Sequence, residues 1–188
     1  MSGPYILLKS GNLFYFSPVM IERNIYTVDD VASGLAGEPR YSNQMIDDSL
    51  HFSVAEHSCI IHDHMPDLET RAQALVHDGP EAFFRDLSGP LKHFCPDYRN
   101  LIDLCEVDMY SRLDLRWPKS PYVKHADEWM LRVESEQLLH HSADVHFSRW
   151  PEPPVKIKLE CWDKPRARAE FMQRFEDCFG ALDEILPV

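Results

Sequence analysis

The feature that most constrains this chain is an imidazole beside a carboxylate, His77 and Asp78, within the stretch 75–92. An apolar run leads into this pair, so both side chains can turn toward one divalent cation. A helix that ends at the histidine, with the aspartate in a turn, is the alternative interpretation. A second pair, His62 and Asp63, stands among polar neighbours and is the weaker metal candidate.

The residues that follow this pair favour a reactive cleft. A Gly-Pro step breaks the preceding helix, and Pro80 suits the first position of a new one. Glu81 then lies about one helical turn from Asp78 and can face the same cleft. Asp86 and Lys92 come next, and a helix end alone leaves this series of two acids and a base unexplained.

His57 is expected on the buried face of a helix. Ser53 and Glu56 form a capping box, which predicts that a helix begins there. Val54 and Ile61 stand at helical spacing from the histidine, which places it on the apolar stripe. A histidine on such a stripe is commonly a hydrogen-bonded core residue, so His57 is a ligand candidate only in combination with the second motif.

A fourth candidate ligand, Asp127, lies on a helix that we expect to begin at Ser120 and Pro121, an N-cap followed by a first-turn proline. The residues that share one face of this helix are Val123, Asp127, Met130, Leu131 and Glu134. Burying an unpaired carboxylate is costly, so an aspartate on such a face has a cation or a strong donor nearby. A buried lysine or arginine is the alternative partner.

Several motifs, taken in order, resemble those of the HD-domain phosphohydrolases. They are VAEHS at 54–58, HDGPEAFFRD at 77–86, GPLK at 89–92 and VKHADEWMLRVE at 123–134. The N-terminal part, with SG at 10–11 and VDDVASGLAGEPRY at 28–41, resembles the small 5'-deoxynucleotidases and the bacteriophage dATP triphosphohydrolases. The resemblance covers about residues 5–137, and the ordered combination is far more specific than any single motif.

The expected cofactor is a divalent metal. The candidate ligands, drawn from three helices, are His57, His77, Asp78 and Asp127. Two imidazoles and two carboxylates suit zinc, manganese, cobalt or iron and leave positions for water and a phosphate oxygen, while magnesium can accompany the phosphates. His93 and His125 keep a two-metal variant open.

The resemblance also implies roles for the polar residues around the metal. The residue matching Glu81 is the candidate general acid/base, and the one matching Asp86 lies near the sugar and the leaving group. Arg40 and Lys92 match residues that neutralise phosphate. Without the resemblance, Arg40 would be interpreted as a charged residue of a loop and Lys92 as a solvent-exposed base.

The expected substrate is a purine deoxynucleotide, with dATP as the leading candidate, cleaved to deoxyadenosine and triphosphate. Tyr41, Asn43 and Pro90 match the base-pocket positions, where an aromatic face and a proline can hold a flat base. Asn43 can pair with an adenine edge or cap the next turn. The alternatives are a 5'-deoxynucleotidase acting on monophosphates, another HD-type phosphodiesterase or alarmone hydrolase, and a metal-binding module without catalysis.

Composition restricts partners and compartment. The formal net charge of −12 argues against a nucleic acid polymer as partner. The 5 cysteines are scattered without a C-x-x-C pair, which is typical of reduced thiols. No apolar run is long enough to span a membrane and no signal peptide is evident, so we expect a cytoplasmic protein, in the host cytoplasm for a phage protein. The resemblance implies a homo-oligomer, a dimer or a hexamer.

The expected fold is a mainly α, compact HD-domain helical bundle in one domain over residues 1–188. The metal-site core spans about 50–139, preceded by a short β-hairpin at 5–8 and 13–16 and followed by a helical extension at about 140–188. Further expectations concern local features. We expect a helix after Thr27 that Gly34 and Gly37 end, and a later helix whose inward-facing residues are Leu101, Leu104 and Cys105. We expect surface positions for His140, His141 and His146 and a short strand at 155–159. A last helix should begin at Pro165, with a core face formed by Phe171, Phe175, Cys178, Phe179 and Leu182.

Overall fold

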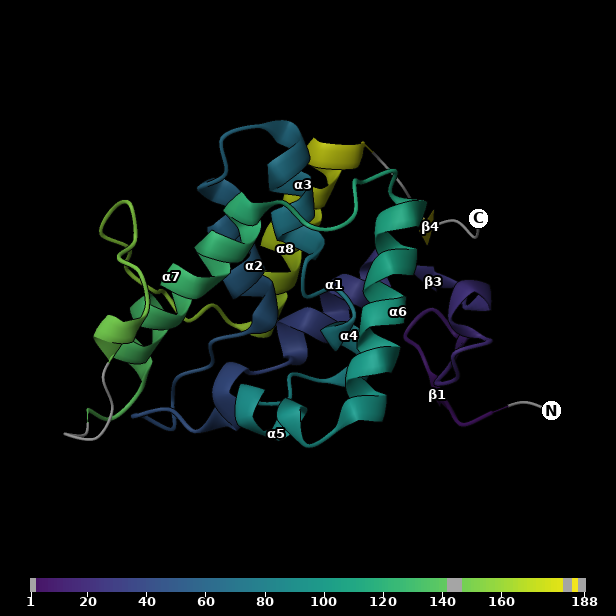
Figure 1. The fold of residues 1–188 in the computed structure, drawn as a ribbon, viewed down its shortest axis with the longest axis horizontal. Helices are drawn as coiled ribbons and strands as arrows, with labels where there is room; N and C mark the ends of the chain where they lie inside the picture. Colours follow the sequence, from purple (N-terminus) through teal and green to yellow (C-terminus); the bar gives the residue numbers. More distant parts are fainter. Residues whose placement is uncertain (1–2, 142–146, 181–183, 186–188) are drawn as a thin grey trace.

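The computed structural model describes residues 3–141, 147–180 and 184–185, and within these ranges the chain is mainly helical (Figure 1). The α-helices are α1 (Val28–Gly37), α2 (Val54–Asp63), α3 (Leu68–Val76), α4 (Glu81–Phe84), α5 (Gly89–His93), α6 (Pro96–Arg112), α7 (Pro121–Leu138) and α8 (Lys164–Phe179). Short 3-10 helices are η1 (Ile21–Arg23), η2 (Arg40–Asn43) and η3 (Phe147–Arg149), and the strands are β1 (Tyr5–Leu7), β2 (Leu13–Tyr15), β3 (Tyr26–Thr27) and β4 (Glu184–Ile185). The predicted mainly helical chain with an N-terminal hairpin and a C-terminal helix is confirmed.

The N-terminal hairpin is fastened to α1. β1 pairs antiparallel with β2, with Tyr5 opposite Tyr15. The backbone N–H of Ser10, in the hairpin turn, donates to the Asp30 carboxylate at 2.8 Å. The same carboxylate accepts from the backbone of Thr27, whose hydroxyl accepts from the backbone of Asp30, so a complete capping box begins α1. One aspartate therefore fixes both the helix start and the hairpin.

Two apolar clusters meet at α2 and α3. One joins these helices to the hairpin, α1, α4, α6 and α8, and the other joins them to α7. In the first cluster Phe14 of the hairpin stacks on Phe83 of α4, with ring centroids 4.2 Å apart. In Figure 1, α2, α3 and α8 lie in the middle, with α7 on one side and α6 on the other. Side chains on α2 and α3 are therefore held from both sides.

The C-terminal helix α8 packs against α1, α2 and α3. Ala167, Phe171 and Phe175 are buried there, which confirms the expected core positions of the two phenylalanines. Cys178 and Phe179 are half-buried, and Leu182 lies outside the described residues. The helix thus contributes to the same core as α1 and α2.

The expected strand at 155–159 is not formed. This segment is irregular and pairs with no strand of the described residues. The backbone donors at its end and just after it bond to side chains. The N–H of Leu159 donates to the Gln137 side chain, and the N–H groups of Glu160, Cys161 and Trp162 donate to the carboxylate of Glu56.

The contacts of Glu56 also correct the capping box expected at the start of α2. The Ser53 side chain accepts a hydrogen bond from the backbone N–H of Glu56, as expected. The Glu56 side chain, however, bonds to the C-terminal segment and not to the backbone of Ser53.

Two local expectations are wrong. Leu104 on α6 is 38% exposed, because the buried face of this helix runs through Cys105 and Met109, one turn apart. Gly34 does not end α1, which continues to Gly37. It instead permits a close approach to α4, since a Cβ on Gly34 would lie 2.6 Å from the backbone oxygen of Ala82.

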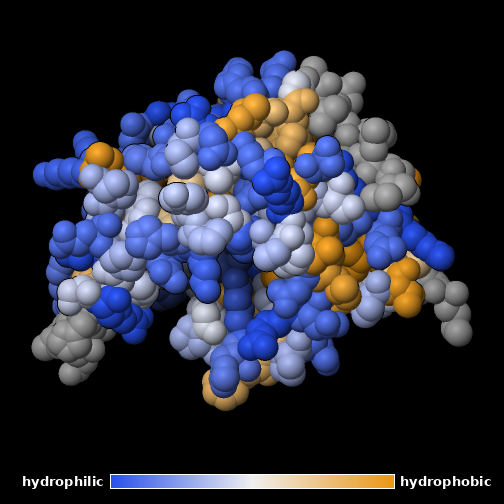
Figure 2. Space-filling view, turned by 45° about the horizontal axis from the view of Figure 1, so that its top comes forward, coloured by the Kyte–Doolittle hydropathy of each residue, from blue (hydrophilic) through white to orange (hydrophobic). Residues whose placement is uncertain are grey.

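The described surface is mostly polar. Figure 2 shows that hydrophilic side chains cover most of the face drawn, while apolar side chains gather mainly toward its right, the side on which α6 and β1 lie in Figure 1. Across the described residues, every helix is too short or too polar to cross a membrane.

Gly34→Ala should destabilise the fold, since the added methyl would overlap Ala82 next to Glu81. We expect a loss of about 1–2 kcal/mol in the free energy of unfolding, because overpacking outweighs the gain in helix propensity. Urea unfolding measures this. Gly37→Ala is the matched control, because its methyl meets only the flexible end of Lys164. Equal stability of the two variants would contradict the packing argument.

Candidate metal centre and active site

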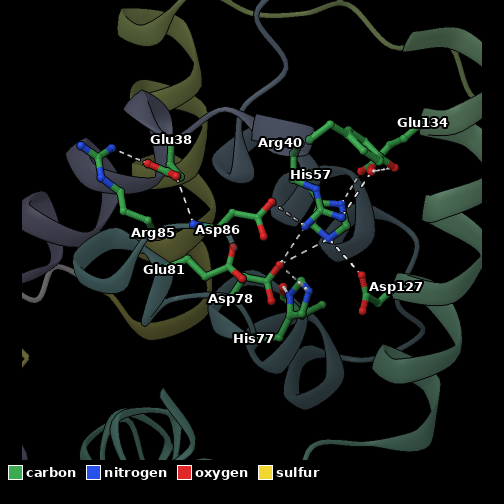
Figure 3. A network of polar contacts seen from close by, with 12 residues as sticks. Glu38, Arg40, His57, His77, Asp78, Glu81, Arg85, Asp86, Asp127 and Glu134 are labelled. Carbon is green, nitrogen blue, oxygen red and sulfur yellow. Dashed lines mark hydrogen bonds and ion pairs between the residues drawn. The ribbon is translucent and has the colours of Figure 1, made fainter. Parts of the chain in front are cut away.

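Two buried histidines form the centre of the site (Figure 3). His57 lies on α2 and His77 caps the C-terminus of α3, with ring centroids 5.3 Å apart. Their exposed fractions are 0% and 3%. The Nε2 atoms of both rings are buried and have no hydrogen-bond partner. Together with a carboxylate oxygen of Asp127, they lie within 4.8 Å of one another, so this group could hold a metal ion.

The opposite nitrogens of these rings are held in place. Nδ1 of His57 donates to the Glu134 carboxylate at 2.5 Å, and Nδ1 of His77 donates to the backbone oxygen of Ala74 at 2.7 Å. Such bonds fix the ring orientation and leave the Nε2 atom available to a metal, as is usual for metal-binding histidines. Both rings are therefore preset to present Nε2 to one point.

The electrostatics of the two rings differ. Burial lowers the pKa of His77, which favours a neutral ring with a free lone pair. Burial and Arg40 also lower the pKa of His57, but Glu134 and Asp127 outweigh them and raise it to about 9. A cation, whether a proton or a metal, is thus favoured at Nε2 of His57.

Two aspartates flank these nitrogens. The Asp127 carboxylate lies 3.3 Å from Nε2 of His57, and Oδ2 of Asp78 lies 3.3 Å from Nε2 of His77 and 3.7 Å from that of His57. Burial raises the pKa of Asp127, but the histidines overcome it and lower the value. The Asp127 side chain is 41% exposed, so it borders a cavity instead of lying inside the apolar stripe. In the described structure its ion-pair partner is His57, not a lysine or an arginine.

The sequence analysis missed the role of Glu134. Its side chain is fully buried and accepts hydrogen bonds from His57 at 2.5 Å, from the hydroxyl of Tyr41 at 2.8 Å and from Arg40 at 3.3 Å. A signal was present in the sequence: Glu134 stands two helical turns after Asp127 on the same face of α7. The carboxylate predicted to be buried on this face was Asp127, but the fully buried one is Glu134.

Arg40 and Tyr41 reach the site from a strained turn. Tyr41, Ser42 and Asn43 have φ values of 56°, 52° and 59°, left-handed conformations that non-glycine residues rarely adopt in succession. Such residues cost on the order of 1–3 kcal/mol each and persist where their surroundings hold them. The Arg40 guanidinium lies 3.3 Å from Glu134, 3.5 Å from Asp78 and 3.9 Å from Asp86.

Glu81 and Lys92 form a second polar group in the same cavity. The Lys92 ammonium lies 2.7 Å from Oε1 of Glu81 and 3.5 Å from Asp86. Oε2 of Glu81 is buried without a partner. Burial, Asp78 and Asp86 raise the pKa of Glu81 to about 8, against the opposing effect of Lys92 and Arg40. This carboxyl group can therefore carry a proton near neutral pH.

Several of these polar groups border a cavity of about 550 Å³, whereas His57, His77 and Glu134 are not among its lining residues. Its lining comprises Arg40, Tyr41, Asp78, Glu81, Asp86, Leu87, Ser88, Gly89, Pro90, Lys92, Asp127, Leu131, Ser135, Leu139, Phe147, Arg149 and Trp150. Of the predicted substrate-binding residues, only Asn43 is absent from the lining, and its side chain is exposed. His93 and His125, the residues that kept a second metal open, are also exposed and outside it, as are His140 and His141, while His146 is outside the described residues.

The fold and the site define a helical protein with a group, His57, His77 and Asp127, that could hold a metal ion, and Asp127 of this group also lines the cavity. Comparison with known proteins finds two relatives of this chain. The chain is 30% identical over 134 residues to the uncharacterized protein YfdR of Escherichia coli, and the matched segment covers 71% of this chain and 72% of YfdR. The uncharacterized protein RCAP_rcc00048 of Rhodobacter capsulatus is 29% identical over 163 residues, or 78% and 82% of the two chains.

The chain therefore belongs to the same family as YfdR. No protein-family model matches it. Neither relative's name states an activity, so a function can be inferred only from the residues of the site.

Glu134→Gln should weaken metal binding about 10- to 100-fold, because an amide is a poorer acceptor for His57 and carries no charge to favour a cation. Zinc is a suitable probe, titrated in competition with a chromophoric chelator, with circular dichroism to verify folding. Glu128→Gln, an exposed glutamate on the same helix, is the control and should bind zinc like the parent protein. Unchanged zinc affinity in Glu134→Gln would refute this role.

Proposed function

We propose that this protein is a metal-dependent phosphohydrolase of the HD-domain type that cleaves purine deoxynucleotides, with dATP converted to deoxyadenosine and triphosphate. The observation that carries the proposal is a group of buried atoms without a hydrogen-bond partner: Nε2 of His57, Nε2 of His77 and Oε2 of Glu81. Asp78, Asp127 and Glu81 line one cavity, and the two aspartates lie beside the histidine nitrogens. Buried polar atoms normally have hydrogen-bond partners, so this group supports the binding of a ligand. The ordered motifs of the sequence support the same reaction class.

The proposed metal ligands are His57, His77, Asp78 and Asp127. This donor set suits zinc, manganese or cobalt, and magnesium can accompany the phosphates. A cation held there would supply a Lewis acid for the phosphate and lower the pKa of a water molecule toward about 7.

Glu81 has the geometry of the proton donor. Its Oε1 is fixed by Lys92 at 2.7 Å, which leaves Oε2 to hold a proton inside the cavity. In the proposed step, the oxygen of water bonds to phosphorus, the bond from phosphorus to the 5' oxygen breaks, and the proton of Glu81 passes to that oxygen. The proton lost by water restores Glu81.

Arg40, Lys92 and Asp86 would orient the phosphate and the sugar. The two cations are neutralised by carboxylates in this structure, so an incoming phosphate would share them with Asp78, Asp86 and Glu81. The Arg40 side chain is only 9% exposed, which leaves it little freedom to follow a long phosphate chain. This observation favours the second candidate function, a 5'-deoxynucleotidase that acts on deoxynucleoside monophosphates.

The reaction is tested by incubating the purified protein with dATP, dAMP, dGTP, dCTP and ATP at equal concentration. We expect deoxyadenosine and intact triphosphate from dATP, no turnover after chelation, and recovery with zinc, manganese or cobalt. Burying the 2'-hydroxyl of ATP without a partner would cost on the order of 1–3 kcal/mol, so ATP should react more slowly. A preference for a pyrimidine or a ribonucleotide, or release of single phosphates from dATP, would overturn the proposal. Faster cleavage of dAMP would select the second candidate.

Glu81→Gln should lower kcat by about 10²-fold or more, because the amide cannot donate a proton to the leaving oxygen. Metal content should stay at the parent level. Steady-state kinetics and metal analysis of the same preparation measure both. Glu176→Gln, an exposed glutamate on α8, is the control. Loss of metal together with rate would make Glu81 a ligand instead of the proton donor.

A further inference from the structure

The segment after α7 brings aromatic side chains to the cavity. Phe147, Arg149 and Trp150 all line it, although the sequence predicted only a loop here. The Phe147 and Trp150 rings are nearly parallel, with 13° between their planes and centroids 6.5 Å apart. The Arg149 guanidinium lies 4.1 Å from the centroid of the Trp150 ring. None of these residues has a role in the proton or metal chemistry.

The segment that contains Phe147, Arg149 and Trp150 is positioned by its contacts with α7. Helix positions four apart share a face, and the cavity lining takes Asp127, Leu131, Ser135 and Leu139 from α7 and its C-cap. A helix rises about 1.5 Å per residue, so this wall extends about 18 Å from the metal group. η3 packs against α7, and the Phe147 ring meets the ring of His141 just beyond the helix end. The aromatic segment thus lies at the far end of the wall.

We propose that Phe147 and Trp150 form the surface on which the base of the nucleotide stacks. This inference rests on the proposed function, which puts the phosphate ester at the metal group. The sugar would then pass Leu131 and Ser135, and the base would reach the aromatic end. A flat base and an aromatic ring stack regardless of base edge, so these residues supply affinity, and selectivity for a purine follows from its larger face.

Two of the residues first expected to bind the base, Tyr41 and Asn43, are less suited to it, while Pro90 does line the cavity. The Tyr41 hydroxyl is committed to Glu134 at 2.8 Å, and burial together with that carboxylate raises its pKa. Asn43 is exposed and outside the cavity. Trp150 and Phe147 are half-buried, so each can present part of its ring to a ligand.

Arg149 is a positioning residue for Trp150. Its guanidinium lies over the indole, a cation–π contact that restrains the ring. In the described ranges no carboxylate pairs with Arg149, whereas Arg40 and Lys92 are both paired. The contact with Trp150 is therefore its principal restraint within those ranges.

The test measures binding of deoxyadenosine by calorimetry, which is independent of hydrolysis. Trp150→Leu should weaken binding about 10-fold or more, Phe147→Leu less, and Arg149→Gln about 2- to 5-fold. Phe94→Leu is the matched control, because Phe94 is 79% exposed and does not line the cavity. Circular dichroism verifies that each variant is folded. For dAMP hydrolysis, Trp150→Leu should raise KM more than it lowers kcat.

The outcomes separate this inference from the proposed reaction. Equal deoxyadenosine affinity in Trp150→Leu and the parent protein, or no binding to the parent at millimolar concentration, would overturn the stacking surface even with active dATP hydrolysis. Binding that Trp150→Leu abolishes, in a protein that hydrolyses no nucleotide, would support the surface and contradict the reaction.

Discussion

The hydrogen bond between Glu134 and His57 is the interaction on which the site depends. A fully buried carboxylate is costly unless strong donors surround it, and Glu134 has three, from α2 and from the turn that carries Arg40 and Tyr41. Burial raises the pKa of Glu134, but Arg40 and His57 outweigh it and lower the value, so the group stays ionised. It joins α7 to α2 and holds the left-handed residues of η2 in place.

Other buried carboxylates hold the surrounding segments in a similar way. Glu56, one residue before the central histidine, accepts three backbone N–H groups from the segment that ends at Trp162, which attaches the C-terminal part to α2. Glu38 pairs with Arg85 and accepts the backbone N–H of Asp86, which fixes the loop after α4. Each contact satisfies a polar group far along the sequence, so the segments around the cavity are held by the same contacts that join them to the core.

These long-range contacts explain what the sequence could and could not predict. Helix starts such as the one at Thr27 depend on residues three apart and were correctly predicted. Apolar periodicity predicted the buried position of His57, and the combination of motifs predicted that it meets His77. The partners of Glu134 and the return of Trp150 to the cavity depend on contacts across many residues, which local patterns do not encode. The strand expected at 155–159 also depended on a distant neighbour, and the N–H groups of Leu159 and of Trp162, just beyond it, donate to side chains.

The charge of the cavity region sets a requirement on any phosphate ligand. The carboxylates gathered there are Asp78, Glu81, Asp86, Asp127 and Glu134, and the cations that pair with them are Arg40 and Lys92. Even with a proton on His57 the acids outnumber the bases, and the whole chain carries −12, so an anionic phosphate would be repelled. A proton on Glu81 and a divalent cation beside the histidines would together remove this excess negative charge. In the proposed reaction, cation binding is therefore a condition for substrate binding as well as for chemistry, because the same carboxylates that favour the cation oppose the phosphate without it.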